Sequence, residues 1–194
     1  AESAVKLASA LYSSLGVVLL DPLDSEIKTL MQPVLRRECG RLSETSSEQI
    51  REKSGRILKN GYKLQVRQPE DRLHAFIHEN GFRVPIFRKN GDVIDSDGRR
   101  IDPAGQILTP NVLSRNLCQD AFLNTVCFVG GPSEIAYQAL LDGLYRAHGM
   151  NMPVIMSRYM GTVVDTTAER LLSQLSAAPE TFITRPADEA VSEI

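Results

Sequence analysis

The sequence predicts an α/β fold in which a parallel sheet with helices on both faces is interrupted by a small β-rich insertion. Residues 17–20 are four consecutive apolar residues, two of them β-branched, which is typical of a strand buried on both faces. Residues 126–175 alternate strand and helix patterns twice, as the crossovers of a parallel sheet require. Between these parts the pattern changes to short strand-like pieces separated by Asn-Gly pairs.

Helical periodicity accompanies these strands. Residues 1–15 carry apolar side chains at helical spacing, and Gly16 follows them as a typical C-terminal glycine. Four more helices are expected at residues 25–37, 48–58, 132–147 and 166–175. The strands of the last third are expected at residues 126–129 and 153–156.

The predicted elements divide the chain into three parts. They are a first part of the core at residues 1–40, a helical link with the β-rich insertion at residues 41–108, and a second part of the core at residues 109–194 that leads toward a C-terminal helical region. Short strands are predicted in the insertion at residues 64–66, 75–77 and 84–87, with hairpin signals at Asn80-Gly81 and Asn90-Gly91.

His74 and His78 lie four residues apart in this insertion. On a helix that spacing suits a metal ion, whereas on a strand it only places both side chains on one face. No third ligand lies nearby in the sequence. We therefore interpret both as ordinary surface histidines and predict no metal site.

Composition narrows the function classes. The 194 residues are 42% hydrophobic and 24% charged, with a formal net charge of -2, which describes a globular chain of one to two domains. There is no basic excess to attract nucleic acid or an anionic membrane, and no apolar run long enough to cross a bilayer. We expect a cytoplasmic protein with no nucleic-acid or membrane partner. Cys39, Cys118 and Cys127 are interpreted as reduced, structural thiols.

The candidate site is the turn after the strand at residues 126–129. Gly130-Gly131 form this turn, Pro132 stands where a first helical residue needs no amide donor, and Glu134 falls in the first helical turn. Ligands of parallel sheets gather outside the carboxyl ends of the strands. Asp21 and Ser157-Arg158 are expected at two other strand ends, so the three features together predict a small-molecule site.

Two interpretations of the turn stay open. The glycines could serve only close packing of helix on sheet, but the preceding segment supplies a surplus of polar side chains, namely Asn111, Arg115, Gln119 and Asp120. Neither GxGxxG nor a phosphate loop is present, and Glu134 would repel a phosphate at the helix start, so an ammonium or a sugar hydroxyl suits it better. Arg115 and Arg158 could clamp a carboxylate or phosphate, or could tie loops together through ion pairs.

Several linked blocks resemble one family. They are Asn111 to Arg115 (NVLSR), Gln119-Asp120, residues 129–137 (VGGPSEIAY), Met152-Pro153-Val154 with Arg158, residues 16–22 (GVVLLDP) and Gly61-Tyr62. In order and approximate spacing they resemble the signature of the BshC family, the cysteine-adding enzymes of bacillithiol biosynthesis. The chain departs from the family pattern at Asn116 and Asn124, where the family tends to have proline.

The resemblance implies a Rossmann-like core of the nucleotidyltransferase type, interrupted by a connecting insertion, as in class I aminoacyl-tRNA synthetases. It also implies a coiled coil beyond the core that pairs two chains, so the full-length protein would be a homodimer. Family members are much longer than this chain. We therefore expect a central fragment, without the amino-terminal portion that carries a Gly-Gln-Gln motif, and inactive by itself.

The implied reaction is the ligation of cysteine to glucosaminyl malate through a new carbon–nitrogen bond. No cofactor is expected to be tightly bound, and ATP or ADP is the candidate nucleotide. By resemblance, Glu134 would hold an amino group or a ribose, and Arg115 and Arg158 would hold malate carboxylates or phosphate charge. The binding residues are Asp21, Asn111, Arg115, Asp120, Gly130, Gly131, Ser133, Glu134, Tyr137 and Arg158; no catalytic residue is assigned. The alternatives are a non-catalytic nucleotide- or metabolite-binding α/β module and a purely structural domain.

Overall fold

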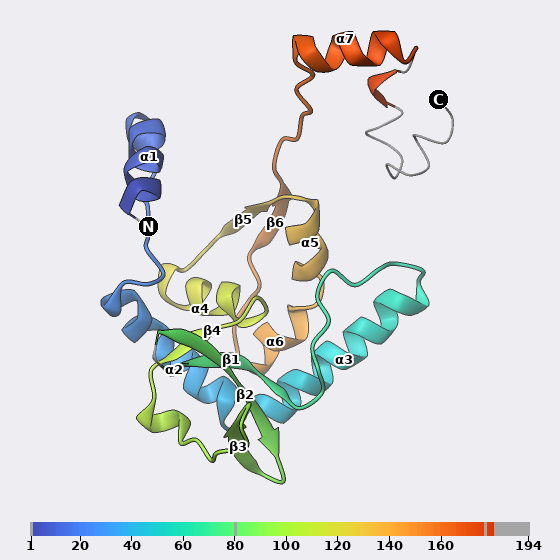
Figure 1. Cartoon of the computed structure of the whole chain (residues 1–194). Coiled ribbons are helices and arrows are strands. Elements are labelled where there is room, and N and C mark those ends of the chain that lie inside the picture. Colours follow the sequence, from blue (N-terminus) through green and yellow to red (C-terminus); the bar gives the residue numbers. More distant parts are fainter. Residues whose placement is uncertain (1, 80, 177, 181–194) are drawn as a thin grey trace. The chain divides into compact units, whose positions relative to one another are not determined.

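The computed structural model describes residues 2–79, 81–176 and 178–180 of the chain (Figure 1). The chain divides into two compact units, Ala1–Ser157 and Arg158–Ile194. All described strands belong to the first unit. The predicted division at residues 40 and 108 concerns segments within the first unit and stays a prediction.

The amino-terminal segment is helical as expected, but the strand predicted after it is absent. Helix α1 spans Glu2–Tyr12, a short 3-10 turn spans Ser13–Leu15, and Gly16 closes the segment in the left-handed conformation at φ 69°. Residues 17–20 form no strand, and their side chains are between 42% and 80% exposed. The prediction was wrong because a strand exists only by pairing, and this apolar run pairs with none of the described strands.

Two long helices follow. Helix α2 spans Ser25–Cys39 and begins at Asp24, whose Oδ1 accepts hydrogen bonds from the backbone of Glu26 and Ile27. Helix α3 spans Ser43–Lys59 and therefore begins five residues earlier than predicted. Its early start has a packing reason, since Ser43, Ser46 and Ile50 share one buried face at helical spacing.

The β-rich insertion is confirmed as an antiparallel sheet in the order β3-β2-β1-β4. Asn90 and Gly91 both take positive φ, at 52° and 85°, which is the type I′ geometry that an Asn-Gly hairpin favours. Asn80, in the other predicted hairpin, lies outside the described residues. Residues 64–66 form no strand, although Leu64 and Val66 pack against the core. The four strands are β1 (Arg72–Glu79), β2 (Phe82–Lys89), β3 (Asp92–Asp95) and β4 (Leu108–Pro110).

The hydrophobic core lies between this sheet and the helices. Helix α2 packs against β1 and β4, and Figure 1 shows it beside the green strands. Helix α4, Ser114–Leu123, packs against α2. Leu35, Ile86, Leu108 and Leu117 are fully buried at 0% exposure and join the helices to the sheet.

The parallel part of the fold consists of two strands, β5 (Cys127–Gly130) and β6 (Val154–Ser157), so the α/β prediction is confirmed in this part. The single helix expected between them is divided into α5 (Pro132–Gln138) and α6 (Asp142–Ala147). Hydrogen bonds from Leu140 N to Tyr137 O and from Leu141 N to Gln138 O are of the tighter i to i−3 type, and they separate the two helices.

The second unit contains helix α7, Thr166–Gln174, close to the predicted bounds. Asp165 begins it by accepting a hydrogen bond from the backbone N–H of Ala168 at 2.8 Å. No helix in the described part of the chain is long and apolar enough to span a membrane.

Candidate functional site

The glycine turn lies at the end of the parallel pair. β5 ends at Gly130, which stands opposite Ser157 at the end of β6. The N–H of Gly131 donates a hydrogen bond to Glu134 Oε2 at 2.7 Å, so the glutamate caps the helix that carries it. The carboxylate thus complements the positive end of α5, as the sequence indicates.

Gly130 has a clear packing reason. A Cβ at this position would lie 2.5 Å from Phe128 Cε1 and 3.2 Å from Glu134 Cβ, so a side chain would displace the phenylalanine ring. Gly130 therefore has a packing reason, and its binding role stays a prediction. Gly131 is buried in an extended conformation, and Ser133 is exposed at the start of α5. Their binding roles stay predictions.

Arg115 and Tyr137 join the segment before the turn to the helix after it. The guanidinium of Arg115 on α4 donates to the hydroxyl of Tyr137 on α5 at 3.3 Å. Tyr137 is only 7% exposed, whereas Arg115 is exposed. Among the described residues no carboxylate pairs with Arg115, so its charge is not used in an ion pair.

Asn111 shapes the start of α4. Its Oδ1 accepts hydrogen bonds from the backbone N–H groups of Leu113 at 2.9 Å and Ser114 at 3.1 Å, and its Nδ2 donates to Gln68 Oε1 at 3.1 Å. These contacts occupy the polar atoms of a side chain that is 6% exposed. In this arrangement Asn111 positions backbone, and its expected role in orienting a substrate stays a prediction.

Asp120 is held between two helices. Its Oδ2 accepts a hydrogen bond from the hydroxyl of Tyr145 on α6, and its Oδ1 is buried with no partner among the described residues. Burial and the hydrogen bond to Asp120 both raise the pKa of Tyr145. Asp120 also lines a hollow of about 360 Å³ beside Asn124 and Asn151.

Asp21 does not lie at the end of a strand, where the sequence places it. Asp21 is exposed and its Oδ1 accepts from the N–H of Leu23 at 2.8 Å, in a turn before α2. No strand ends there, so its expected position at a strand end is wrong. Arg158 begins the second unit, and its convergence on the turn stays a prediction.

A buried polar network escaped the sequence analysis. Glu38 on α2 lies 2.5 Å from His74 Nδ1 through one oxygen, and 2.8 Å from both His148 Nε2 and Ser46 Oγ through the other. All four side chains are at most 4% exposed. His74 is therefore not the surface histidine that we expected, because the middle of β1 packs beneath α2.

The network holds Glu38 ionised. Burial alone would raise the pKa of its carboxyl, but the hydrogen bonds from His148 and His74 outweigh burial and lower the pKa to about 2. Next to it, burial and the charge of Glu38 raise the pKa of Cys39 to about 12, which makes that thiol unreactive. The available sequence signal was an acidic residue at a core position of α2, between Leu35 and Cys39.

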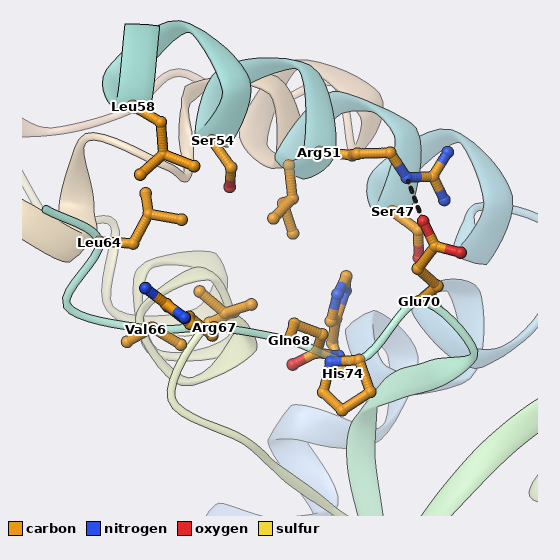
Figure 2. A pocket seen from close by; sticks show the side chains of 13 residues that line it. Ser47, Arg51, Ser54, Leu58, Leu64, Val66, Arg67, Gln68, Glu70 and His74 are labelled. Carbon is orange, nitrogen blue, oxygen red and sulfur yellow. Dashed lines mark ion pairs between the residues drawn. The ribbon is translucent and has the colours of Figure 1, made fainter. Parts of the chain in front are cut away.

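A groove of about 390 Å³ opens between α3 and residues 64–70 (Figure 2). Leu58 and Leu64 line it from its two sides, and His74 lies at its base. At its rim Arg51 and Glu70 form an ion pair of 3.5 Å, but their side chains are 60% and 79% exposed. Water screens such a pair, so it contributes little to holding the groove.

The two-stranded parallel pair, its crossover helices and the glycine turn define an α/β domain, and the predicted ligand site lies at the strand ends of this domain. The family described as "Bacillithiol biosynthesis BshC, N-terminal Rossmann-like domain" matches residues 1–159. The chain belongs to this family, and the resemblance drawn from its motifs is confirmed.

Curated relatives named "Putative cysteine ligase BshC" support the assignment. A protein of Thermus thermophilus is 32% identical over 87% of this chain, that of Desulforamulus reducens is 28% identical over 87%, and that of Staphylococcus haemolyticus is 26% identical over 96%. The chain spans about a third of the length of these relatives, since the alignments cover 36%, 33% and 36% of them.

Proposed function

We propose that this chain forms part of a ligase that condenses cysteine with glucosaminyl malate through an amide bond. One observation carries the proposal: the family match covers residues 1–159 and includes the complete glycine turn with its capping glutamate. A strand-end turn of this kind is where α/β sheets place small ligands.

The turn suggests a division of roles. Glu134 would hold the amino group or a ribose hydroxyl, because a carboxylate at this position favours a hydrogen-bond donor over an anion. Arg115 would hold a carboxylate of the malyl group or developing phosphate charge, since its guanidinium is exposed and pairs with no described carboxylate. We assign the same role to Arg158 on the basis of the family resemblance alone.

The chemistry requires an activated carboxyl, since an amide does not form from a free carboxylate in water. We propose ATP or ADP as the loosely bound nucleotide that takes part in this activation. The three histidines of the chain hydrogen-bond to Glu38 or to Thr109, so no histidine base is assigned to the turn. We further propose that the full-length protein is a cytoplasmic homodimer.

The test uses the full-length protein with cysteine, glucosaminyl malate and ATP, and mass spectrometry detects the amide product. We expect Glu134→Gln to lower kcat/KM at least about tenfold, because it removes a charge-assisted hydrogen bond at the site. Glu52→Gln, at an exposed position of α3, is the matched control and should leave the rate unchanged. Equal activity of the two variants would show that Glu134 does not take part in the site.

The alternative function is a non-catalytic binding module. Calorimetric titration with ATP, ADP, cysteine and malate separately, repeated on Glu134→Ala and Arg158→Ala, would detect it. Saturable binding without product formation by the full-length protein would favour the module over the ligase.

A further inference from the structure

Four arginines line one hollow on the first unit. The hollow lies where the segment before β1 meets β1, β2 and the start of α4, and its volume is about 380 Å³. This volume falls within the roughly 300–1,000 Å³ of small-molecule sites. The arginines are Arg67, Arg72, Arg83 and Arg115.

The charge of this hollow is unbalanced. No aspartate or glutamate lines it, and among the described residues none of the four guanidinium groups pairs with a carboxylate. The whole chain has a formal net charge of -2, whereas this hollow carries four positive charges that no described carboxylate balances. A site with this local excess attracts anions.

Neutral groups hold three of these arginines in place. Arg72 and Arg83 both stack on the ring of Phe76, with Cζ 5.1 Å and 4.1 Å from its centroid. Arg83 also donates to the carbonyl of Pro110, and Arg115 donates to the hydroxyl of Tyr137. These contacts orient the guanidinium groups and leave their positive charge uncompensated.

The backbone around the hollow is fixed as well. Gln68 Nε2 donates to the carbonyl of Arg72 at 2.6 Å, and Gln68 Oε1 accepts from Asn111 Nδ2 at 3.1 Å. This side chain ties the segment that carries Arg67 to both β1 and the start of α4. The arginines therefore line the hollow on a preorganised frame, which lowers the entropy cost of binding a ligand.

The cations disturb one another. Partial burial and the neighbouring charge of Arg72 lower the pKa of Arg83. In addition, Nε of Arg72 is buried with no hydrogen-bond partner among the described residues. A bound anion would relieve the repulsion between the guanidinium groups and would accept hydrogen bonds from their remaining N–H groups.

We propose that this hollow binds the doubly charged end of a small molecule, either a dicarboxylate or a phosphate. Guanidinium groups present paired N–H donors that match the paired oxygens of both anions. The proposal deepens the proposed ligase function, on which it rests for the choice of L-malate as a probe. It adds Arg67, Arg72 and Arg83 to Arg115 as the residues that recognise the anion.

The experiment is calorimetric titration of this chain with L-malate and with inorganic phosphate, with acetate as the singly charged comparison. We expect one saturable site for L-malate or for phosphate, at least about tenfold weaker binding of acetate, and weaker binding as NaCl is raised. The anion that binds more tightly shows whether the hollow recognises a dicarboxylate or a phosphate. Absence of saturation by both would overturn the proposal.

Substitutions locate the site. Arg67→Gln and Arg115→Gln change exposed side chains, so the variants should keep the melting temperature of the parent, and each should raise Kd at least about tenfold. Arg83→Gln should do the same. The matched control is Arg36→Gln on the exposed face of α2, which removes the same charge outside the hollow. If the control weakens binding as much as the other variants, the proposal fails.

The full-length protein separates this proposal from the ligase function. If the protein binds the anion through Arg67 and Arg83 but does not ligate cysteine, the anion-binding proposal is supported and the ligase proposal is refuted. The opposite result is ligation of cysteine with no anion binding, and an unchanged KM for the malate substrate in Arg67→Gln and Arg83→Gln. It would refute the anion-binding proposal and support the ligase proposal.

Discussion

The antiparallel sheet and the parallel pair differ in how much core supports them. Strand β1 of the antiparallel sheet buries Leu73, Ala75 and Ile77, and β2 buries Ile86 completely. Among the described residues, neither β5 nor β6 contributes a buried hydrophobic side chain to the core. Parallel strands are ordinarily covered on both faces, so this pair is the less supported of the two regions.

The difference separates stability from binding. The Glu38 network joins α2 to β1 through His74, to α3 through Ser46 and to the end of α6 through His148, so it lies in the core and not at the turn. The turn that carries the predicted ligand site ends the thin pair, where Val129 is 58% exposed and Met156 is 54% exposed. A two-stranded sheet is marginal by itself, so the site depends on the neighbouring region for its geometry.

The largest effect is expected in the core of the antiparallel sheet. Ile86→Ala should lower the free energy of unfolding by about 2–5 kcal/mol, because it removes buried methyl groups and leaves a cavity. Urea denaturation followed by circular dichroism measures the change. Phe82→Ala, on the same strand but 75% exposed, is the control and should cost far less. Equal costs at the two positions would contradict the comparison.

Acid should weaken the same region through Glu38. The pKa of Glu38 in the folded protein is about 2, below its ordinary value of 4.5, so the stabilisation is complete above that ordinary value and is lost as the pH falls toward 2. A shift of this size corresponds to stabilisation on the order of 3 kcal/mol.

Glu38→Gln provides the comparison, since it keeps the shape and removes the titration. The difference in unfolding free energy between the parent and this variant, measured by urea titration at pH 6 and pH 3, should shrink at the lower pH. A difference that stays constant with pH would show that the interactions with His74 and His148 do not hold the carboxylate ionised.

Tyr145→Phe should have an intermediate effect. The change leaves both oxygens of the buried Asp120 carboxylate without a described protein partner, which costs about 1–3 kcal/mol. Thermal denaturation measures the loss, and Tyr62→Phe, at a tyrosine that is 70% exposed, is the control. Adding Asp120→Asn should cost less in the Tyr145→Phe background than in the parent, and additive costs would show that the two residues are not coupled.

Local signals predicted the elements that depend on local chemistry. Asn90-Gly91 was predicted correctly because two positive φ values suit these residues. The strands near residues 126–129 and 153–156 were predicted because both are short apolar runs, and a glycine turn marks the end of the first. Residues 17–20 carry the same kind of run, yet pairing with another strand decides whether such a run becomes a strand.

The candidate sites depend on contacts that are distant in sequence. Glu38 lies 36 residues from His74 and 110 residues from His148, so no spacing rule could join them. The arginines of the hollow come from several elements of the first unit, and of these only Arg115 carried a sequence motif. The sequence therefore predicted the turn and its glutamate, while the buried network and the cationic hollow required the fold.

The smallest effect is expected on the parallel pair. Val129 and Met156 stand opposite each other across β5 and β6, and both are more than half exposed. The double variant Val129→Ser/Met156→Ser should change the free energy of unfolding by less than about 1 kcal/mol, because little apolar surface is buried there. Urea denaturation at two protein concentrations tests this. A cost above about 2 kcal/mol that grows with concentration would show that a second copy of the chain covers this face in solution, since association stabilises by mass action.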